Sequence, residues 1–183
     1  MSAIRFSPRE VDPRISTDVP TLLRQLVRPD RSFTCRRGSP EEDRRGIDYQ
    51  VESFDGYRYN IDTKDRFGNR GRCDDFALEL ISVIETQTIG WTLDDSKLTD
   101  YAVWIFHRDD TRRYDIVPYR PLRSAFKYYR DVWIRRFGTF DTESFDDLGR
   151  RWHSRAVFVP RNVLQPALLQ FDPTAIIETG RYR

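Results

Sequence analysis

Cysteine, histidine and lysine are all scarce in this chain. Its 183 residues include two Cys, two His and only three Lys, which are Lys64, Lys97 and Lys127. Two cysteines make no disulfide framework, and Cys35 and Cys73 have no zinc-ligand spacing with each other or with a histidine. We therefore expect two reduced thiols and no zinc site, as in a cytoplasmic protein.

Long apolar runs are missing as well. No stretch approaches the roughly 18 apolar residues that a membrane span requires, and the N-terminus lacks the apolar core of a signal peptide. Hydrophobic residues are only 38% of the chain, but 12 Phe, 9 Tyr and 4 Trp supply large buried area. The sequence thus predicts one globular domain over residues 1–183 without membrane contact, in which the polar, proline-interrupted residues 1–18 are loosely held.

Local residue patterns predict an α+β fold. Helices are expected to begin at Pro20, at Pro40 after the N-cap Ser39, at Pro121 and at Asn162, with the second ending at Gly46. Strands are expected over residues 47–54, 57–64, 76–84, 101–106, 113–117 and 156–159, the first three forming an antiparallel meander. Residues 101–106 are nearly all apolar, which predicts a central strand, and residues 138–152 are expected to be irregular.

The strands 47–54 and 57–64 form a hairpin whose register can be deduced. A two-residue loop would set the polar side of one strand against the apolar side of the other, because one residue of slip reverses every side chain. A three-residue loop with Gly56 in the left-handed position avoids this conflict. The resulting pairs are Val51 with Tyr59, Tyr49 with Ile61, and Glu52 with Arg58.

The same register sets Asp48 opposite Asp62. Directly opposed like charges destabilise a sheet, but a Mg²⁺ ion between them would reverse that effect. Lys64 lies on the same face as Asp62, where its ammonium could hold or deprotonate a water molecule. The alternative is a solvated hairpin face with two tolerated Asp residues. A second Asp-x-Lys triplet, residues 95–97, lies in a loop without an opposed acidic strand, so we reject it as a metal site.

At these positions the chain resembles a known family. Asp48, thirteen intervening residues and then Asp62-Thr63-Lys64 resemble the D…(D/E)-x-K signature of PD-(D/E)XK nucleases. Residues 76–80, 90–91 and 95–101 resemble, in that order, an uncharacterised phage and bacterial branch of the superfamily. The resemblance covers about residues 41–106. Ile47 replaces the proline of the family name, and Asp62 stands where Glu is more usual.

The resemblance implies a restriction-endonuclease-like αβββαβ core, with a mixed central sheet flanked by helices. It also implies hydrolysis of phosphodiester bonds with Mg²⁺ or Mn²⁺, here by a DNA endonuclease. By the same resemblance Asp48, Asp62 and the Thr63 carbonyl are metal ligands, and Lys64 positions or activates water. Glu79 and Glu42 could add ligands, although Glu79 is equally well explained as a surface carboxylate.

Basic side chains suggest where a nucleic acid would bind. Arg123, Lys127 and Arg130 form a stripe on the helix that begins at Pro121, which is either a phosphate contact or a solvated helix face. Further candidates for phosphate binding are Arg66, Arg70, Arg72 and Lys97. The alternative function is a catalytically inactive nuclease-fold protein that serves as a binding subunit of a phage or defence assembly. A homodimer is compatible with either function.

Overall fold

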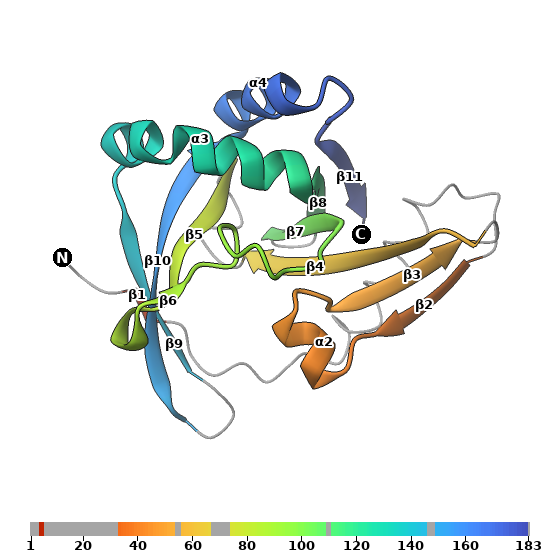
Figure 1. Cartoon of the computed structure of the whole chain (residues 1–183), viewed down its shortest axis with the longest axis horizontal. Helices are drawn as coiled ribbons and strands as arrows, with labels where there is room; N and C mark the ends of the chain where they lie inside the picture. Colours follow the sequence, from red (N-terminus) through yellow and green to blue (C-terminus); the bar gives the residue numbers. More distant parts are fainter. Residues whose placement is uncertain are drawn as a thin grey trace. The chain divides into compact units, whose positions relative to one another are not determined.

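The computed structural model of the chain describes residues 4–5, 33–53, 56–66, 74–108, 111–145 and 149–182 (Figure 1). The helix expected at Pro20 lies outside these residues. Of the expected loosely held segment, residues 1–18, only Ile4–Arg5 are described. The chain divides into two compact units. The first unit comprises Met1–Arg9, Cys73–Asp95 and Arg120–Ile176, and the second comprises Glu10–Arg72, Ser96–Tyr119 and Ile177–Arg183. One domain can contain two such units, so the expectation of a single domain stays a prediction.

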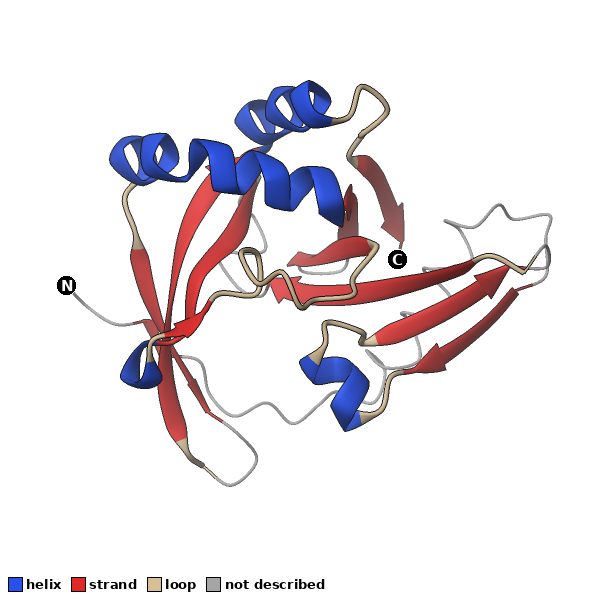
Figure 2. Cartoon of the chain, viewed as in Figure 1, coloured by secondary structure: helices blue, strands red, loops and turns tan. Residues whose placement is uncertain are grey.

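The first unit is built on a five-stranded sheet with the order β1-β9-β10-β5-β6. Figure 2 draws the strands in red and the helices in blue. Its strands are β1 (Ile4–Arg5), β5 (Asp75–Val83), β6 (Thr88–Ile89), β9 (Phe140–Phe145) and β10 (Arg151–Pro160), and its helical elements are η2 (Ile84–Thr86), α3 (Tyr119–Phe137) and α4 (Arg161–Phe171). The helices expected at Pro121 and Asn162 are confirmed as α3 and α4. None of the described helices is long and apolar enough to cross a bilayer.

The expectation that residues 138–152 are irregular is wrong, because they contain β9 and the first residues of β10. Polar cross-strand pairs hold these two strands together. Arg155 binds Asp141 through two N–H···O contacts of 2.7 and 2.8 Å, and the hydroxyls of Thr142 and Ser154 lie 2.7 Å apart. Such a ladder does not show the apolar alternation by which a strand is recognised in a sequence.

The second unit is built on a six-stranded sheet with the order β11-β8-β7-β4-β3-β2. Its strands are β2 (Phe33–Arg37), β3 (Tyr49–Ser53), β4 (Arg58–Arg66), β7 (Tyr101–Arg108), β8 (Thr111–Pro118) and β11 (Glu178–Tyr182), and its helix is α2 (Pro40–Arg44). The central position expected for residues 101–106 is confirmed, since β7 lies between β4 and β8. The sequence analysis missed β11.

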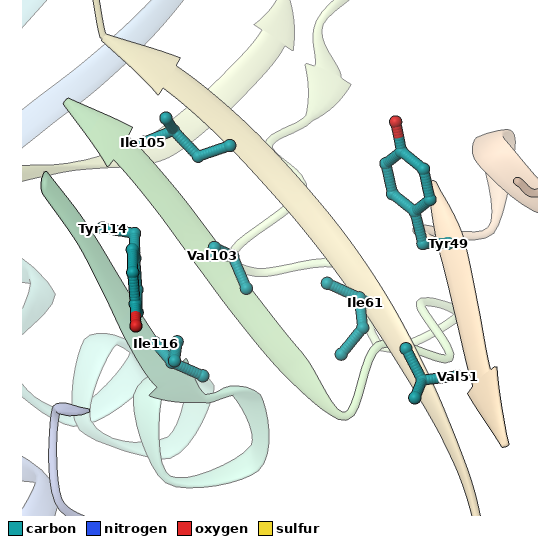
Figure 3. Close-up of a cluster of buried hydrophobic side chains, with 7 residues drawn as sticks. All are labelled: Tyr49, Val51, Ile61, Val103, Ile105, Tyr114 and Ile116. Atoms are coloured by element: carbon teal, nitrogen blue, oxygen red, sulfur yellow. The ribbon is translucent and has the colours of Figure 1, made fainter. Parts of the chain in front are cut away.

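One face of this sheet carries a compact apolar cluster (Figure 3). Its buried members are Tyr49, Val51, Ile61, Val103, Ile105, Tyr114 and Ile116, which come from the four strands β3, β4, β7 and β8. The four strands therefore share this apolar face, and Ala102, Trp104 and Phe106 bury the other face of β7 as well. Their alternate residues, including those of the candidate site on β4, point to the other face.

The hairpin register predicted from the sequence is confirmed. Val51 pairs with Tyr59 and Tyr49 with Ile61, while Arg58 Nε donates to Glu52 Oε2 at 2.8 Å. Gly56 has the positive φ, +82°, that the predicted three-residue loop requires of it. The other two loop residues, 54 and 55, lie outside the described residues.

The expected meander is wrong at its third strand. Strand β5 pairs with β10 and β6 in the sheet of the first unit. The second neighbour of β4 is β7, which runs parallel to it. A parallel neighbour requires a long connection, which the chain between β4 and β7 supplies. The fold is therefore α+β with a mixed sheet, as predicted at that level.

Helix α2 begins at Pro40 as predicted and ends at Arg44, two residues before the predicted Gly46, and the turn that follows it positions Asp48. Ser39 Oγ accepts from the Glu42 N–H at 3.3 Å, and the Glu42 carboxylate accepts from the Ser39 N–H at 2.8 Å, which completes a capping box. After the helix Gly46 adopts a φ of +77°. Thr99 Oγ1 donates to the Gly46 carbonyl at 2.7 Å, and a Cβ at Gly46 would lie only 2.5 Å from that hydroxyl oxygen. Only glycine fits this turn without displacing Thr99.

We expect Gly46→Ala to lower the free energy of unfolding by about 2–4 kcal/mol. A side chain at positive φ costs roughly 1–2 kcal/mol, and displacing the Thr99 hydroxyl costs about as much again. Gly56→Ala is the matched control, because Gly56 has a similar φ and nothing within 4 Å of its added Cβ. Urea unfolding measures both losses, and equal losses would contradict a role for the Thr99 contact.

Candidate functional site

Asp48 lies where the ladder between β3 and β4 ends. The Asp48 N–H donates at 2.9 Å to the carbonyl of Ile61, the residue with which Tyr49 is already paired. The ladder is therefore irregular at Asp48, and its expected continuation to a direct Asp48–Asp62 pair is not found. Instead the Asp48 carboxylate takes the place of a backbone acceptor, because its Oδ2 accepts from Thr63 N–H at 2.7 Å and from Thr63 Oγ1 at 2.6 Å.

Asp62 and Lys64 point to one face of β4 and form an ion pair. Lys64 Nζ lies 2.8 Å from Asp62 Oδ1. The Asp62 side chain is only 5% exposed, while that of Lys64 is 30% exposed. Asp48 interacts electrostatically with both, since the charge of Asp48 disfavours ionisation of Asp62 and the charge of Lys64 favours ionisation of Asp48. The structure thus brings Asp48, Asp62 and Lys64 together.

The carboxyl groups of this cluster have shifted pKa values. Burial raises the pKa of Asp62 to about 6, the nearby charge of Lys64 opposes the rise, and the charge of Asp48 adds to it. Burial also opposes the ionisation of Asp48. Nevertheless the pKa of Asp48 is lowered, by a hydrogen bond with Asp43, by the charge of Lys64 and by hydrogen bonds from Thr63. Such opposed shifts are typical of carboxylates gathered at a functional site.

Asp43 is a member of the cluster that the sequence analysis missed. A hydrogen bond with Asp48 raises the pKa of Asp43, and burial adds to this rise. The hydrogen bond between them therefore favours the ionised form of Asp48 over that of Asp43. The sequence analysis selected the neighbouring Glu42 as the helix acid. Helix direction distinguishes the two, because successive residues on a helix point about 100° apart.

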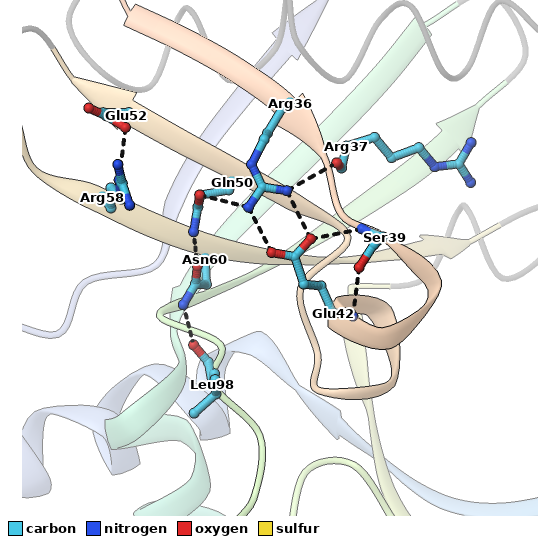
Figure 4. A network of polar contacts seen from close by, with 9 residues as sticks. All are labelled: Arg36, Arg37, Ser39, Glu42, Gln50, Glu52, Arg58, Asn60 and Leu98. Carbon is cyan, nitrogen blue, oxygen red and sulfur yellow. Dashed lines mark hydrogen bonds and ion pairs between the residues drawn. The ribbon is translucent and has the colours of Figure 1, made fainter.

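The Glu42 carboxylate is engaged elsewhere (Figure 4). Arg36 binds it through both guanidinium nitrogens at 2.7 and 2.8 Å, and the Ser39 N–H donates to it. The hydrogen bond from Arg36 lowers the pKa of Glu42 to about 2, with that from Ser39 as the next cause. Gln50 accepts another hydrogen bond from Arg36 at 2.9 Å. The structure gives Glu42 a role in capping α2 and joining it to the sheet, and does not direct it to Asp48.

The segment 97–99 holds the end of α2 in place. Lys97 Nζ donates to the Arg44 carbonyl at 2.6 Å, and the Leu98 N–H donates to the Arg45 carbonyl at 2.9 Å. Lys97, which was expected to bind phosphate, thus satisfies a carbonyl at the helix C-terminus, a favourable place for a cation. These contacts fix the turn that leads into Asp48.

The remaining candidates of the sequence analysis lie in different surroundings. Glu79 belongs to the first unit, where its carboxylate accepts from Ser82 Oγ at 2.5 Å and from the Trp91 N–H at 3.2 Å. Arg66 is buried at the end of β4, with 7% of its surface exposed. Arg70 and Arg72 lie outside the described residues.

The basic stripe on α3 is partly neutralised within the first unit. Lys127 Nζ contacts both carboxylate oxygens of Asp95 at 2.6 and 2.7 Å, and Arg123 Nη1 lies 3.5 Å from the same residue. Arg130 pairs with its neighbour Asp131 at 3.1 Å. All three predicted cations therefore have an acidic partner. Asp95, from the rejected Asp-x-Lys triplet, serves here as a counter-ion.

The donor atoms around Asp48 suit a hard cation. Within the described residues, no group of three or more His, Cys, Asp or Glu side chains is arranged to hold a metal ion. Mg²⁺, however, is often bound by one or two carboxylates, with water or phosphate oxygens as the other ligands. The N–H and C=O of a strand residue point to the same edge, so the Thr63 carbonyl faces the edge at which Asp48 binds its N–H. Asp48, Asp62 and the Thr63 carbonyl are thus oxygen donors of the kind that Mg²⁺ or Mn²⁺ prefers.

No protein-family model matches the chain, and no curated protein or solved structure matches it either. The chemistry of the cluster therefore carries the argument about function.

Asp62→Asn is expected to change how stability depends on pH. Because the pKa of Asp62 in the folded protein, about 6, lies above its ordinary value of 3.8, the folded state binds this proton more tightly than the unfolded chain. This stabilising effect is fully present below about pH 4 and is lost as the pH rises through 6. The penalty at neutral pH is on the order of 3 kcal/mol, and an uncharged Asn avoids it.

The measurement is urea unfolding in a chelating buffer between pH 4 and pH 8. The variant should gain stability relative to the wild type as the pH rises, whereas Glu52→Gln, which alters an exposed carboxyl on the same hairpin, should not. A constant difference between Asp62→Asn and the wild type across this range would show that Asp62 is not protonated near pH 6.

Proposed function

We propose that this protein is a magnesium-dependent nuclease of the PD-(D/E)XK type, and specifically a DNA endonuclease. The observation that carries the proposal is the gathering of Asp48, Asp62 and Lys64 at the end of the β3–β4 hairpin. Isolated carboxylates of this kind repel each other, and a buried one is costly to ionise. A bound divalent cation offsets both effects and leaves positive charge to attract an anionic phosphate.

In this proposal Asp48, Asp62 and the Thr63 carbonyl hold Mg²⁺ or Mn²⁺. When bound, such an ion polarises a phosphoryl oxygen and increases the acidity of a water molecule. The protein supplies the orientation. The hydrogen bonds from Thr63 hold Asp48 in one rotamer, and burial restricts Asp62 to one position.

Lys64 has the role of positioning the attacking water. Its ammonium is anchored on Asp62, yet 30% of the side chain is exposed, so water reaches it from solvent. A water oriented there would attack phosphorus while the P–O bond to the leaving oxygen breaks. The proton lost by the attacking water passes to solvent, and the leaving oxygen takes up a proton from solvent. The scarcity of lysine in this arginine-rich chain favours a specific need for a compact ammonium at this position.

The restriction-endonuclease-like core belongs to the same proposal. Helix α2, the hairpin β3–β4 and the parallel neighbour β7 support it, since a helix, an antiparallel pair and a parallel strand occur in that core. The pairing of β5 with β10 departs from it. Glu79, on β5, is therefore not included among the proposed ligands.

Metal binding is expected to raise the melting temperature of the wild type and not of Asp62→Asn. At 100 times the dissociation constant, a ligand adds about 2.7 kcal/mol to the free energy of unfolding, which corresponds to roughly 5–10 °C for a chain of this length. Thermal melting with Mg²⁺ or Mn²⁺ provides the readout. Glu52→Gln should keep the full shift. If neither ion moves the melting temperature of the wild type, the metal site is excluded.

Lys64→Ala is expected to lower the rate of DNA cleavage about 10²–10⁴-fold, the usual contribution of a group that assists proton transfer. Its metal-induced melting shift should remain, because Lys64 is not among the proposed ligands. Cleavage of plasmid and branched DNA with Mn²⁺ compares the variant with the wild type. Equal cleavage rates would remove Lys64 from the reaction.

The ion pair between Lys64 and Asp62 favours a second candidate function. A protein cation already neutralises the buried carboxylate, as expected in a nuclease fold that has become a binding subunit of a larger assembly. In that case the wild type neither binds the metal nor cleaves DNA. The melting experiment therefore separates the two functions.

A further inference from the structure

A row of arginines crosses the sheet of the second unit beside the candidate site. In the ladders of β4, β7, β8 and β11, Arg66 is paired with Phe106, Phe106 with Arg113, and Arg113 with Arg181. Residues paired across neighbouring strands point to the same face of a sheet. Arg66, Arg113 and Arg181 therefore form one row across four strands, called here the arginine row.

The arginine row lies on the face that carries the candidate site. Lys64 is two residues before Arg66 on β4, and alternate residues of a strand point to one face. Across the sheet Lys64 is followed by Trp104 and Asp115. The arginine row thus lies about 6.6 Å along the strands from the row that contains Lys64.

Arg113, in the middle of the row, is held in a fixed orientation. Its guanidinium stacks on the ring of Phe106, 4.1 Å from the ring centroid, and its Nη2 lies 3.3 Å from Asp115 Oδ2. Asp115 is fully buried, and its Oδ1 accepts from Thr179 Oγ1 at 2.6 Å. A guanidinium fixed in this way loses little side-chain entropy when it binds an oxyanion.

The charges of this face favour an anionic ligand. Arg113 stands directly opposite Arg181, and opposed like charges destabilise a sheet. In the two rows that contain Lys64 and Arg66, the described charged side chains are four cations, Lys64, Arg66, Arg113 and Arg181, and one carboxylate, Asp115. A phosphodiester backbone offsets this excess of positive charge.

We propose that the exposed end of the arginine row, Arg181 with Arg113 beside it, binds backbone phosphates of a nucleic-acid strand that also passes through the candidate metal centre. The proposal rests on the proposed function. Exposure increases along the row, because Arg66 is buried, the Arg113 side chain is 11% exposed and Arg181 is exposed. The strand therefore contacts Arg181 from solvent and reaches Arg113 next to it. Guanidinium groups bind phosphate oxygens through paired N–H donors, without reading sequence.

The test is the salt dependence of DNA binding, measured by fluorescence anisotropy with a labelled 20-base-pair duplex in EDTA. Each phosphate contact contributes about −0.9 to the slope of log K against log salt. Arg181→Gln should reduce that slope by about one contact. Its affinity deficit relative to the wild type should therefore narrow about threefold between 50 and 200 mM salt. Because Arg181 is exposed, the variant keeps the fold, which its melting temperature checks.

Arg112→Gln is the matched control. Arg112 precedes Arg113 on β8 and is paired with His107 and Tyr182, so it points to the opposite face of the sheet. The Arg112→Gln variant should show the wild-type slope of log K against log salt. The proposal is overturned if Arg181→Gln also keeps the wild-type slope, or if Arg112→Gln loses as much of it.

Arg113→Lys tests the fixed guanidinium. Lysine keeps the positive charge beside the buried Asp115, so this carboxylate retains a counter-ion. The lysine side chain cannot stack on the ring of Phe106 as the guanidinium does, and it lacks the paired N–H donors. We expect weaker binding at every salt concentration with a nearly unchanged slope. Wild-type affinity in this variant would contradict the role of Arg113.

Cleavage assays separate failure of the arginine row from failure of the proposed function. If the arginine variants behave as expected but the wild type never cleaves DNA with Mg²⁺ or Mn²⁺, phosphate binding by the arginine row is supported and the nuclease function is contradicted. If the wild type cleaves DNA and Arg181→Gln keeps the wild-type slope of log K against log salt, the nuclease function is supported and phosphate binding by the arginine row is contradicted. If the wild type binds neither the duplex nor a single strand of the same sequence at 50 mM salt, both fail.

Discussion

The burial of the Asp62 carboxylate against the Lys64 ammonium is the interaction on which the candidate site depends. Burial alone disfavours the charged carboxylate, and the nearby Asp48 disfavours it further. A buried ion pair of this kind seldom adds stability compared with apolar residues of similar size. Its presence in the sheet is therefore better explained by what the charges do than by what they contribute to folding. The hydrogen bond between Asp43 and Asp48 extends this reasoning to the end of α2.

Much of the hairpin could be predicted from the sequence, because its two strands alternate so strictly that only one register keeps all apolar residues on one face. The same argument fails at Asp48, where it predicted a direct pair with Asp62 that the structure does not have. The irregularity there depends on the turn after α2, which the distant residues Lys97 and Thr99 hold through the carbonyls of Arg44 and Gly46. No local pattern reports such contacts, and for this reason the sequence indicated Glu42 and missed Asp43.

The wrong predictions for β9 and for the partner of β5 also arise because local patterns do not report long-range contacts. Strand β9 pairs through charges and hydroxyls, so its alternation is invisible to a reading based on apolar residues. Strand β5 has a clear apolar pattern, but the pattern does not specify a partner, and β7 rather than β5 pairs with β4. Periodicity predicts that a strand exists and which of its faces is buried, whereas pairing depends on competition among all strands of the chain.

The two groups of cations in this protein differ in how their charge is used. On α3 the stripe lies along one helix and was evident from its spacing, yet Asp95 and Asp131 already neutralise part of its charge. The arginine row comes from three strands that are far apart in the sequence, and only the ladders reveal it. Because a sheet fixes the distance between successive rows, cations in one row keep a constant separation from the carboxylates in the next. The proposed chemistry on one row and the proposed phosphate binding on its neighbour therefore depend on the same backbone hydrogen bonds, and any change that shifts the register of β4 against β7 would disturb both together.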